Sequence, residues 1–144
     1  MDCSLGLIYR RSPHNWMGPG KQPLCLVKRT KSPFIDHYEF PGGQSLKGET
    51  SRDCLARELY EEIGIDPSDC VYIEPEKKVS NSKVHISFFK TITHSYQELK
   101  VKLNIFLVTL PENYALSSME NKNIIFLNPL YDVNFDYLPS TYRV

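Results

Sequence analysis

Three glutamates near the middle of the chain have the spacing of a single helix face. Glu58, Glu61 and Glu62 lie three and four residues apart, so at about 100° per residue they fall within an arc of about 100° on an α-helix. Like charges at this spacing destabilise a helix. A divalent cation would relieve the repulsion, and Mg²⁺ prefers carboxylate oxygens and is often shared with substrate phosphates.

An acidic helix face that is simply solvated is the alternative interpretation. The position of the acids argues against it, because Leu55, Leu59 and Ile63 form an apolar stripe immediately beside them on the same helical projection. The carboxylates therefore border the buried side of the helix. Arg57, four residues before Glu61, is the only cation within local reach of the cluster.

The segment Phe40-Pro41-Gly42-Gly43 precedes this helix by a short loop. Two consecutive residues without a Cβ atom allow the main chain to approach a metal or ligand closely. Taken alone, such a segment is more often an ordinary turn. Its interpretation depends on the residues that follow at fixed distances.

From Gly43 the chain continues with five residues, Glu49, seven residues, and then Arg57-Glu58-Leu59-Tyr60-Glu61-Glu62-Ile63-Gly64-Ile65. This segment, residues 43–65, resembles the Nudix box, Gx5Ex7REUxEExGU with U aliphatic, at every fixed position. Seven identities and two aliphatic positions in one register would arise by chance with a probability on the order of 10⁻⁷ or less. The preceding Glu39-Phe40-Pro41-Gly42-Gly43 resembles the MutT branch of that family.

The resemblance implies the Nudix fold, a mixed β-sheet sandwiched between α-helices, and a site that binds Mg²⁺ or alternatively Mn²⁺. The implied metal ligands are the main chain of Gly42 and the carboxylates of Glu58, Glu61 and Glu62. Glu58 would either ligate the metal or act as general base on the attacking water.

Other residues of the box are expected to support this set. Arg57 would orient a glutamate through a bidentate pair, and we expect it to be architectural and not in contact with substrate. Glu49 would brace the loop or approach the metal through water. Gly43 and Gly64 are structural positions of the motif.

A further acidic ligand is less clearly marked. MutT-type enzymes often supply one after the strand that corresponds to Ile105–Val108, but Thr109 stands there in this sequence. Glu98 and Glu112 are the two replacements that the sequence offers.

Substrate recognition is expected outside the box. Phe40 corresponds to a base-packing position of the family, with a core residue as the alternative. Lys28 or Arg29 could hold a phosphate, or be a surface cation. Asn134, with Asn128 as the other candidate, could read a purine edge, or be a turn asparagine.

The implied activity is Mg²⁺-dependent hydrolysis of a nucleoside triphosphate to the monophosphate and pyrophosphate. An oxidised purine nucleotide such as 8-oxo-dGTP is the favoured substrate, which would make the role nucleotide pool sanitation. A hydrolase of another substrate, such as a pyrimidine triphosphate or a nucleotide sugar, is the alternative. A non-catalytic nucleotide-binding module is disfavoured because all three glutamates are present.

Local patterns predict the elements that position these residues. Thr50 is expected to cap a helix over Ser51–Ile63, with Asp53 in a capping-box relation, and Gly64 to end it. Strands are predicted over 3–9, 24–27, 70–73, 83–89 and 101–110, the first two as a hairpin. The structure of residues 124–144 is left open, with a short helix as one reading. The order of elements indicates a single α+β domain over 1–144.

Composition excludes several classes of protein. Seventeen basic residues balance seventeen acidic ones, so a nucleic acid polymer is not an expected partner. No apolar run is long enough to span a membrane. Cys3, Cys25, Cys54 and Cys70 form no CxxC pair and are expected to be reduced thiols of a cytoplasmic protein. The resemblance implies a small nucleotide as partner, and the chain is expected to be a monomer or homodimer.

Overall fold

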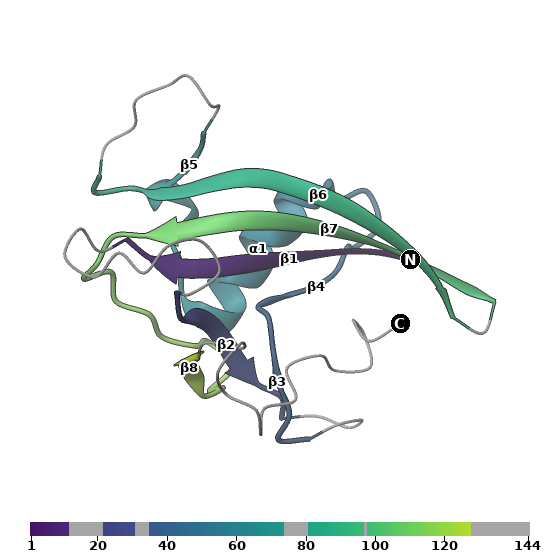
Figure 1. The fold of residues 1–144 in the computed structure, drawn as a ribbon, viewed down its shortest axis with the longest axis horizontal. Coiled ribbons are helices and arrows are strands. Elements are labelled where there is room, and N and C mark those ends of the chain that lie inside the picture. Colours follow the sequence, from purple (N-terminus) through teal and green to yellow (C-terminus); the bar gives the residue numbers. More distant parts are fainter. Residues whose placement is uncertain (12–21, 31–34, 74–80, 97, 128–144) are drawn as a thin grey trace.

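The computed structural model describes residues 1–11, 22–30, 35–73, 81–96 and 98–127. Two β-sheets and one long helix, α1 (Ser51–Ile63), make up its framework (Figure 1). A short 3-10 helix, η1 (Pro67–Asp69), follows α1. Among these described residues α1 is the only α-helix, and the helix considered for the tail falls on residues 128–144, outside them.

The larger sheet is mixed. Its order is β4-β1-β7-β6-β5, and the strands are β1 (Asp2–Arg10), β4 (Gly42–Gln44), β5 (Cys70–Tyr72), β6 (Val84–Tyr96) and β7 (Leu99–Leu110). The pairs β1–β7 and β5–β6 are parallel, whereas β1–β4 and β6–β7 are antiparallel. This arrangement confirms the predicted α+β class with a mixed sheet.

The smaller sheet has the order β3-β2-β8. It consists of β2 (Leu24–Lys28), β3 (Tyr38–Glu39) and β8 (Ile124–Leu127), all antiparallel. The predicted hairpin between the first two strands is therefore wrong. Both edges of β1 are already paired, with Leu5 opposite Gly42 on one side and Ile105 on the other, so β2 joins a different sheet.

The helix has the predicted bounds, Ser51–Ile63. The hydroxyl of Thr50 accepts a hydrogen bond from the Asp53 amide at 3.1 Å, which satisfies one of the free N–H groups of the first turn. Gly64 ends the helix in the left-handed conformation, with φ of +75°. Its amide donates to the carbonyl of Tyr60 at 3.1 Å, and the next amide reaches back to Leu59.

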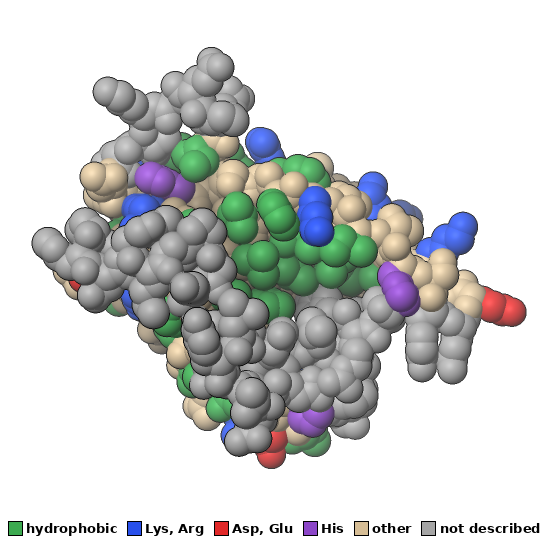
Figure 2. Space-filling view, in the orientation of Figure 1, with side chains coloured by type: hydrophobic (Ala, Val, Ile, Leu, Met, Phe, Trp, Pro, Cys, Tyr) green, Lys and Arg blue, Asp and Glu red, His purple; other side chains and the backbone are tan. Residues whose placement is uncertain are grey.

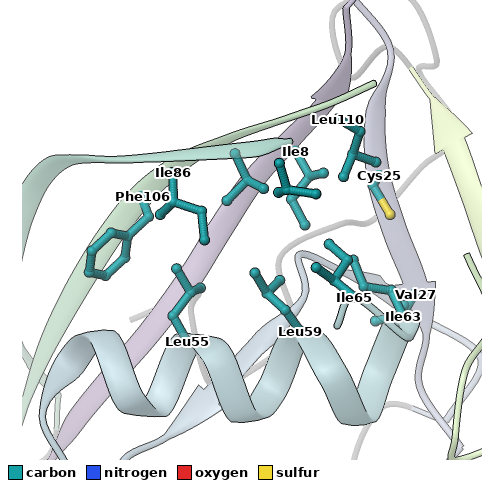
Figure 3. Packing of buried hydrophobic residues seen from close by; sticks show 12 residues of the cluster. Ile8, Cys25, Val27, Leu55, Leu59, Ile63, Ile65, Ile86, Phe106 and Leu110 are labelled. Atoms are coloured by element: carbon teal, nitrogen blue, oxygen red, sulfur yellow. The ribbon is translucent and has the colours of Figure 1, made fainter. Parts of the chain in front are cut away.

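The apolar stripe of α1 fixes the helix on the larger sheet (Figure 3). Leu55, Leu59 and Ile63 are each at most 1% exposed, and they pack with Ile86 and Phe106 in one buried cluster. Burying each such side chain contributes about 1.5–3 kcal/mol. Because the glutamates border this stripe, the core also sets the direction in which they point.

A second buried cluster lies between the two sheets and contains Cys3, Leu5, Leu26, Phe40, Val101 and Ile105. On the face seen in Figure 2, hydrophobic side chains gather over the middle of the larger sheet. Phe88 and Phe89 of β6 are each at least half exposed.

The four cysteines are free thiols. Within the described part of the chain, no helix is both long and apolar enough to cross a membrane.

Candidate active site

The two glycines of β4 bring the main chain against the glutamates of α1. Gly42 has φ of +154°, and a Cβ atom there would overlap the main chain of Ser4. A Cβ atom on Gly43 would lie 2.5 Å from Oε1 of Glu58, closer than real Cβ atoms approach an oxygen. Position 42 therefore requires glycine, and a side chain at position 43 would displace the carboxylate of Glu58.

Glu62 is the most deeply buried of the three glutamates, with 3% of the residue exposed. Its Oε2 atom accepts a hydrogen bond from the Gly42 amide at 2.9 Å, and Oε1 lies 3.2 Å from Nζ of Lys122. Burial raises the pKa of Glu62 to about 8, although Lys122 and the Gly42 amide oppose the shift. A carboxylate in this position needs a nearby cation to remain ionised.

Burial decreases across the cluster toward solvent. The Glu58 side chain is 12% exposed and that of Glu61 is 42% exposed. Burial raises the pKa of Glu58, and the adjacent Arg57 guanidinium opposes that rise. The row thus runs from a buried carboxylate beside β4 to one in contact with water, as expected for acids that border a buried stripe.

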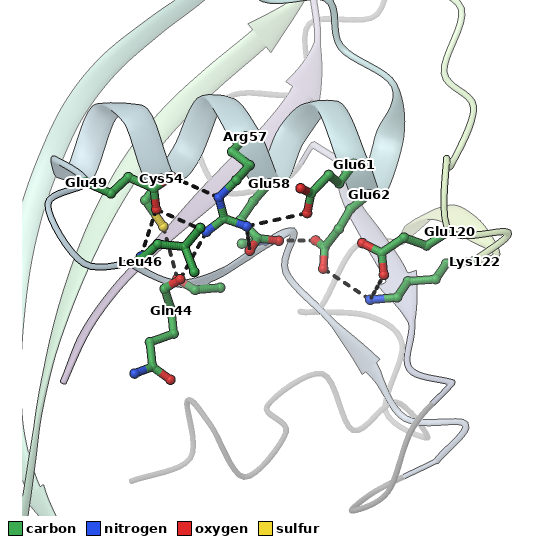
Figure 4. Close-up of polar contacts among 12 residues, drawn as sticks. Gln44, Leu46, Glu49, Cys54, Arg57, Glu58, Glu61, Glu62, Glu120 and Lys122 are labelled. Carbon is green, nitrogen blue, oxygen red and sulfur yellow. Dashed lines mark hydrogen bonds and ion pairs between the residues drawn. The ribbon is translucent and has the colours of Figure 1, made fainter.

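Arg57 holds the loop and the glutamates together (Figure 4). Its guanidinium makes a bidentate pair with Glu49, at 2.9 and 3.1 Å, and donates to the carbonyl of Gln44 at 3.1 Å. Nη1 lies 2.9 Å from Oε1 of Glu58 and 3.4 Å from Oε2 of Glu61. Hydrogen bonds from Arg57 lower the pKa of Glu49. These contacts are those of a positioning residue.

The loop between β7 and β8 folds onto the C-terminal turn of α1. The amides of Ser117 and Met119 each donate to a carbonyl of that turn, Ile63 and Glu61 respectively, at 3.0 Å. These carbonyls have no partner within the helix itself. A Cβ atom on Gly64 would overlap the carbonyl oxygen of Ser117, so the glycine that ends the helix also makes room for the loop.

This loop adds two charged residues to the cluster that sequence analysis missed. Nζ of Lys122 lies 3.2 Å from Glu62 and 3.6 Å from Oε2 of Glu120. Burial alone would lower the pKa of Lys122, but the two carboxylates outweigh it and raise the pKa. No sequence signal marked these residues, because they lie about sixty positions from Glu62 and come near it only through the fold.

The two candidates for a further acid lie elsewhere. Glu98 lies between β6 and β7, with φ of +68°. Glu112 follows β7, where its carbonyl accepts a hydrogen bond from Arg10 at 3.2 Å. Within the described parts of the chain, neither side chain contacts the cluster, whereas Glu120 and Glu62 both form an ion pair with Lys122.

The structure describes three of the residues considered for substrate binding. Phe40 lies in the second buried cluster and is 8% exposed, which is the position of a core residue. Lys28 forms an ion pair with Asp36 at 3.7 Å, and Arg29 forms one with Glu39 at 3.3 Å. Asn128 and Asn134 lie outside the described residues.

The donor chemistry of the cluster fits a hard divalent cation. Its side-chain donors are carboxylate oxygens, and Gly42 and Gly43 add main-chain atoms beside them. In the parts of the chain that are described, no three His, Cys, Asp or Glu side chains converge as a metal centre. Arg57 and Lys122 each form an ion pair with one of these carboxylates.

The structure has the architecture of a Nudix domain: a mixed sheet, a strand with two glycines, and a helix that carries a row of glutamates next to that strand. Residues 14–105 match the NUDIX domain family. Because this match covers more than half of the chain, the chain belongs to that family.

Among curated relatives, the chain is 32% identical over 96 residues to an 8-oxo-dGTP diphosphatase of Proteus vulgaris, a match that covers 67% of this chain and 66% of that protein. It is 42% identical over 55 residues to an RNA pyrophosphohydrolase of Coxiella burnetii, covering 38% of this chain and 23% of that protein. The match therefore spans less than two thirds of either relative.

Solved structures show the same fold. A structure from a study of MutT from Aliivibrio salmonicida and Vibrio cholerae matches with a TM-score of 0.59 and 19% identity, over 97% of this chain and 87% of that one. This likeness establishes the fold.

Proposed function

We propose that this protein hydrolyses a nucleoside triphosphate to the monophosphate and pyrophosphate, with Mg²⁺ as cofactor and Mn²⁺ as an alternative. The observation that carries the proposal is the row Glu58, Glu61 and Glu62, which the core of α1 holds against the glycines of β4. Membership of the Nudix family and the Proteus vulgaris relative support it.

The residues that hold the metal are Glu61, Glu62 and the carbonyl of Gly42, and Glu58 is kept for the base. When bound, the ion neutralises charge on the phosphates and makes water a better nucleophile. We assign the further acid to Glu120, in place of Glu98 or Glu112. Its support is the ion pair that it shares with Lys122 and Glu62.

Glu58 is the general base in this proposal. Its burial raises the carboxylate pKa above the ordinary value, which makes it a stronger base toward a water proton. Arg57 donates to Oε1 of Glu58 at 2.9 Å, so the water proton is assigned to Oε2. Arg57, itself held by Glu49, keeps the carboxylate in one orientation.

We propose an oxidised purine nucleotide such as 8-oxo-dGTP as substrate, which gives the protein a role in nucleotide pool sanitation. The 8-oxo-dGTP diphosphatase relative supports this class. Lys28 is assigned to a phosphate, and Asn134 to the base. The four free cysteine thiols support a cytoplasmic location.

The alternative substrate class within the family is another nucleoside diphosphate derivative, such as a pyrimidine triphosphate or a nucleotide sugar. The RNA pyrophosphohydrolase relative adds a triphosphate at an RNA end to the candidates. A non-catalytic module is disfavoured, because the full carboxylate row is kept in spite of its mutual repulsion.

The test is product analysis with Mg²⁺ and a panel of substrates. The panel contains 8-oxo-dGTP, the normal dNTPs, UDP-glucose, a 5′-triphosphorylated RNA, ADP-ribose and a diadenosine polyphosphate, with Glu58→Gln as the inactive control. Selective release of pyrophosphate from 8-oxo-dGTP supports the whole proposal. Hydrolysis of another member only would reject the substrate, and no hydrolysis of any member would reject the activity.

Asn134 can be tested for base discrimination. If Asn134 reads the base, Asn134→Ala lowers the ratio of kcat/KM for 8-oxo-dGTP over dGTP by roughly tenfold, as expected for one lost hydrogen-bonding group. An unchanged ratio would leave the asparagine in a turn role.

A further inference from the structure

Lys122 occupies a distinctive place in the carboxylate cluster. Its ammonium lies 3.2 Å from Oε1 of Glu62, and its side chain is only 12% exposed. The other oxygen of that glutamate, Oε2, accepts the Gly42 amide. Both oxygens of the most buried carboxylate therefore have a partner within the protein.

The main chain that carries Lys122 is anchored independently of this ion pair. The hydroxyl of Ser118 accepts hydrogen bonds from the amides of Glu120 and Lys122, at 3.2 and 3.1 Å. The Met119 amide ties the same loop to the Glu61 carbonyl of α1. The loop can thus stay in place while the four-carbon side chain of Lys122 changes its conformation.

Electrostatics make the ammonium and a divalent ion competitors for one carboxylate oxygen. A divalent cation on Oε1 of Glu62 would lie within a few ångströms of the Lys122 ammonium if both were retained. The repulsion between a double and a single positive charge at such a separation is severe where water is scarce. One of the two cations must leave Glu62.

We propose that Lys122 is a removable counter-cation of this cluster, which neutralises Glu62 and Glu120 in the metal-free protein and is displaced when the metal binds. This inference rests on the proposed function, because it takes Glu62 as a metal ligand. Figure 4 shows that two cations flank the glutamates, with Arg57 on one side and Lys122 on the other. Of these, Arg57 also holds Glu49 in a bidentate pair, so Lys122 is the cation that moves.

Both measurements are made at pH 9, where Glu62 is ionised because its pKa is about 8. The first is thermal unfolding of Lys122→Gln in EDTA and in saturating Mg²⁺. Removing the ammonium destabilises the metal-free protein, which loses its ion pair, but not the metal-bound protein, in which the pair is already broken. The rise of Tm on adding Mg²⁺ is therefore larger in the variant than in the wild type. Lys102→Gln, which removes an exposed lysine of β7, should change neither value. Equal loss of Tm in both conditions would overturn the proposal.

The second measurement follows the ammonium directly in the wild-type protein. An acylating reagent such as an N-hydroxysuccinimide acetate modifies exposed amines, and peptide mass spectrometry gives the rate at Lys122 relative to the exposed Lys102. In EDTA, Lys122 is expected to react about tenfold more slowly than Lys102, because its ammonium is unpaired in only about one molecule in ten. Saturating Mg²⁺ should remove most of this protection, because the ammonium is then unpaired in most molecules. NaCl of equal ionic strength is the control and should leave Lys122 protected.

The outcomes separate this inference from the function on which it rests. Calorimetric titration with Mg²⁺ first establishes whether the ion binds. If Mg²⁺ binds and Lys122 becomes reactive, the displacement is supported. If Mg²⁺ binds while Lys122 stays protected, the displacement is wrong and the proposed activity stands. If Mg²⁺ does not bind, both are overturned.

Discussion

The two sides of the carboxylate cluster are built in different ways. On one side, β4 and α1 supply glycines, glutamates and Arg57 from a single segment of 24 residues, 42–65. On the other side, the loop before β8 supplies Glu120 and Lys122 through hydrogen bonds to the last turn of α1. Local spacing determines the first side, whereas the tertiary fold determines the second. Variants on the two sides should therefore differ in which property they lose, whether turnover, stability or metal binding.

The largest effect is expected on the local side, at Glu58. Glu58→Gln should lower kcat by on the order of 10²-fold or more, because an amide of the same shape does not accept the proton of water. Circular dichroism should show an intact fold. The matched control is Glu112→Gln, because in the described part of the chain the Glu112 side chain does not contact the cluster. Near wild-type turnover of the folded Glu58→Gln variant would contradict the assigned role.

The next largest effect is expected in the hydrophobic core, which orients α1 and its glutamates. Leu59→Ala should lower the free energy of unfolding by about 2–5 kcal/mol, because it leaves a cavity between α1 and the larger sheet. Urea denaturation measures the change. Tyr60→Ala, one residue along on the exposed face at 44% exposure, should change stability by only about 0.5 kcal/mol. Similar losses in the two variants would mean that the stripe does not fix the helix.

The pH dependence of stability tests the environment of Glu62, which contacts Gly42 on one side of the cluster and Lys122 on the other. Burial raises the folded-state pKa of Glu62 to about 8 from 4.5. Between these two pH values the folded protein therefore binds a proton at Glu62 that the unfolded protein has lost. The stability from this group is fully present below pH 4.5 and is lost as pH rises through about 8. In EDTA, Tm of the wild type should fall between pH 5 and 9 by more than that of Glu62→Gln. Parallel profiles for the two proteins would refute the shift.

A smaller effect is expected on the tertiary side. Glu120→Gln should weaken Mg²⁺ binding by roughly tenfold, as expected for the loss of one charged oxygen donor from a set of several. Glu98→Gln, between β6 and β7, is the control and should have no effect. Equal effects at the two positions, measured by calorimetry, would remove Glu120 from the site.

The same division explains what the sequence could predict. The helix bounds, the Thr50 cap, the Gly64 end and the border position of the glutamates all follow from local spacing, and the structure has each of them. The pairing of β1 was missed because strand partners are chosen by the fold. Lys122 and Glu120 were missed for a related reason, since nothing in their immediate neighbours indicates that their loop returns to α1.

The length of β6 was also underestimated. The predicted strand over 83–89 follows its apolar residues, whereas β6 runs from Val84 to Tyr96. Residues 90–95 are exposed and mostly polar, and the strand pairs with β7 as far as Tyr96 opposite Leu99. Main-chain hydrogen bonds to a partner strand extend a strand beyond its hydrophobic pattern.

The position of β1 in the larger sheet affects the order in which the protein can form during synthesis. β1 leaves the ribosome first, yet its parallel partner β7 follows about a hundred residues later, with Leu5 opposite Ile105. The antiparallel partner β4, with Leu5 opposite Gly42, is available much sooner. Contacts that close long loops form late. The glycine strand and α1 can therefore assemble on the nascent chain, while the Lys122 side of the cluster forms only after the loop before β8 has emerged.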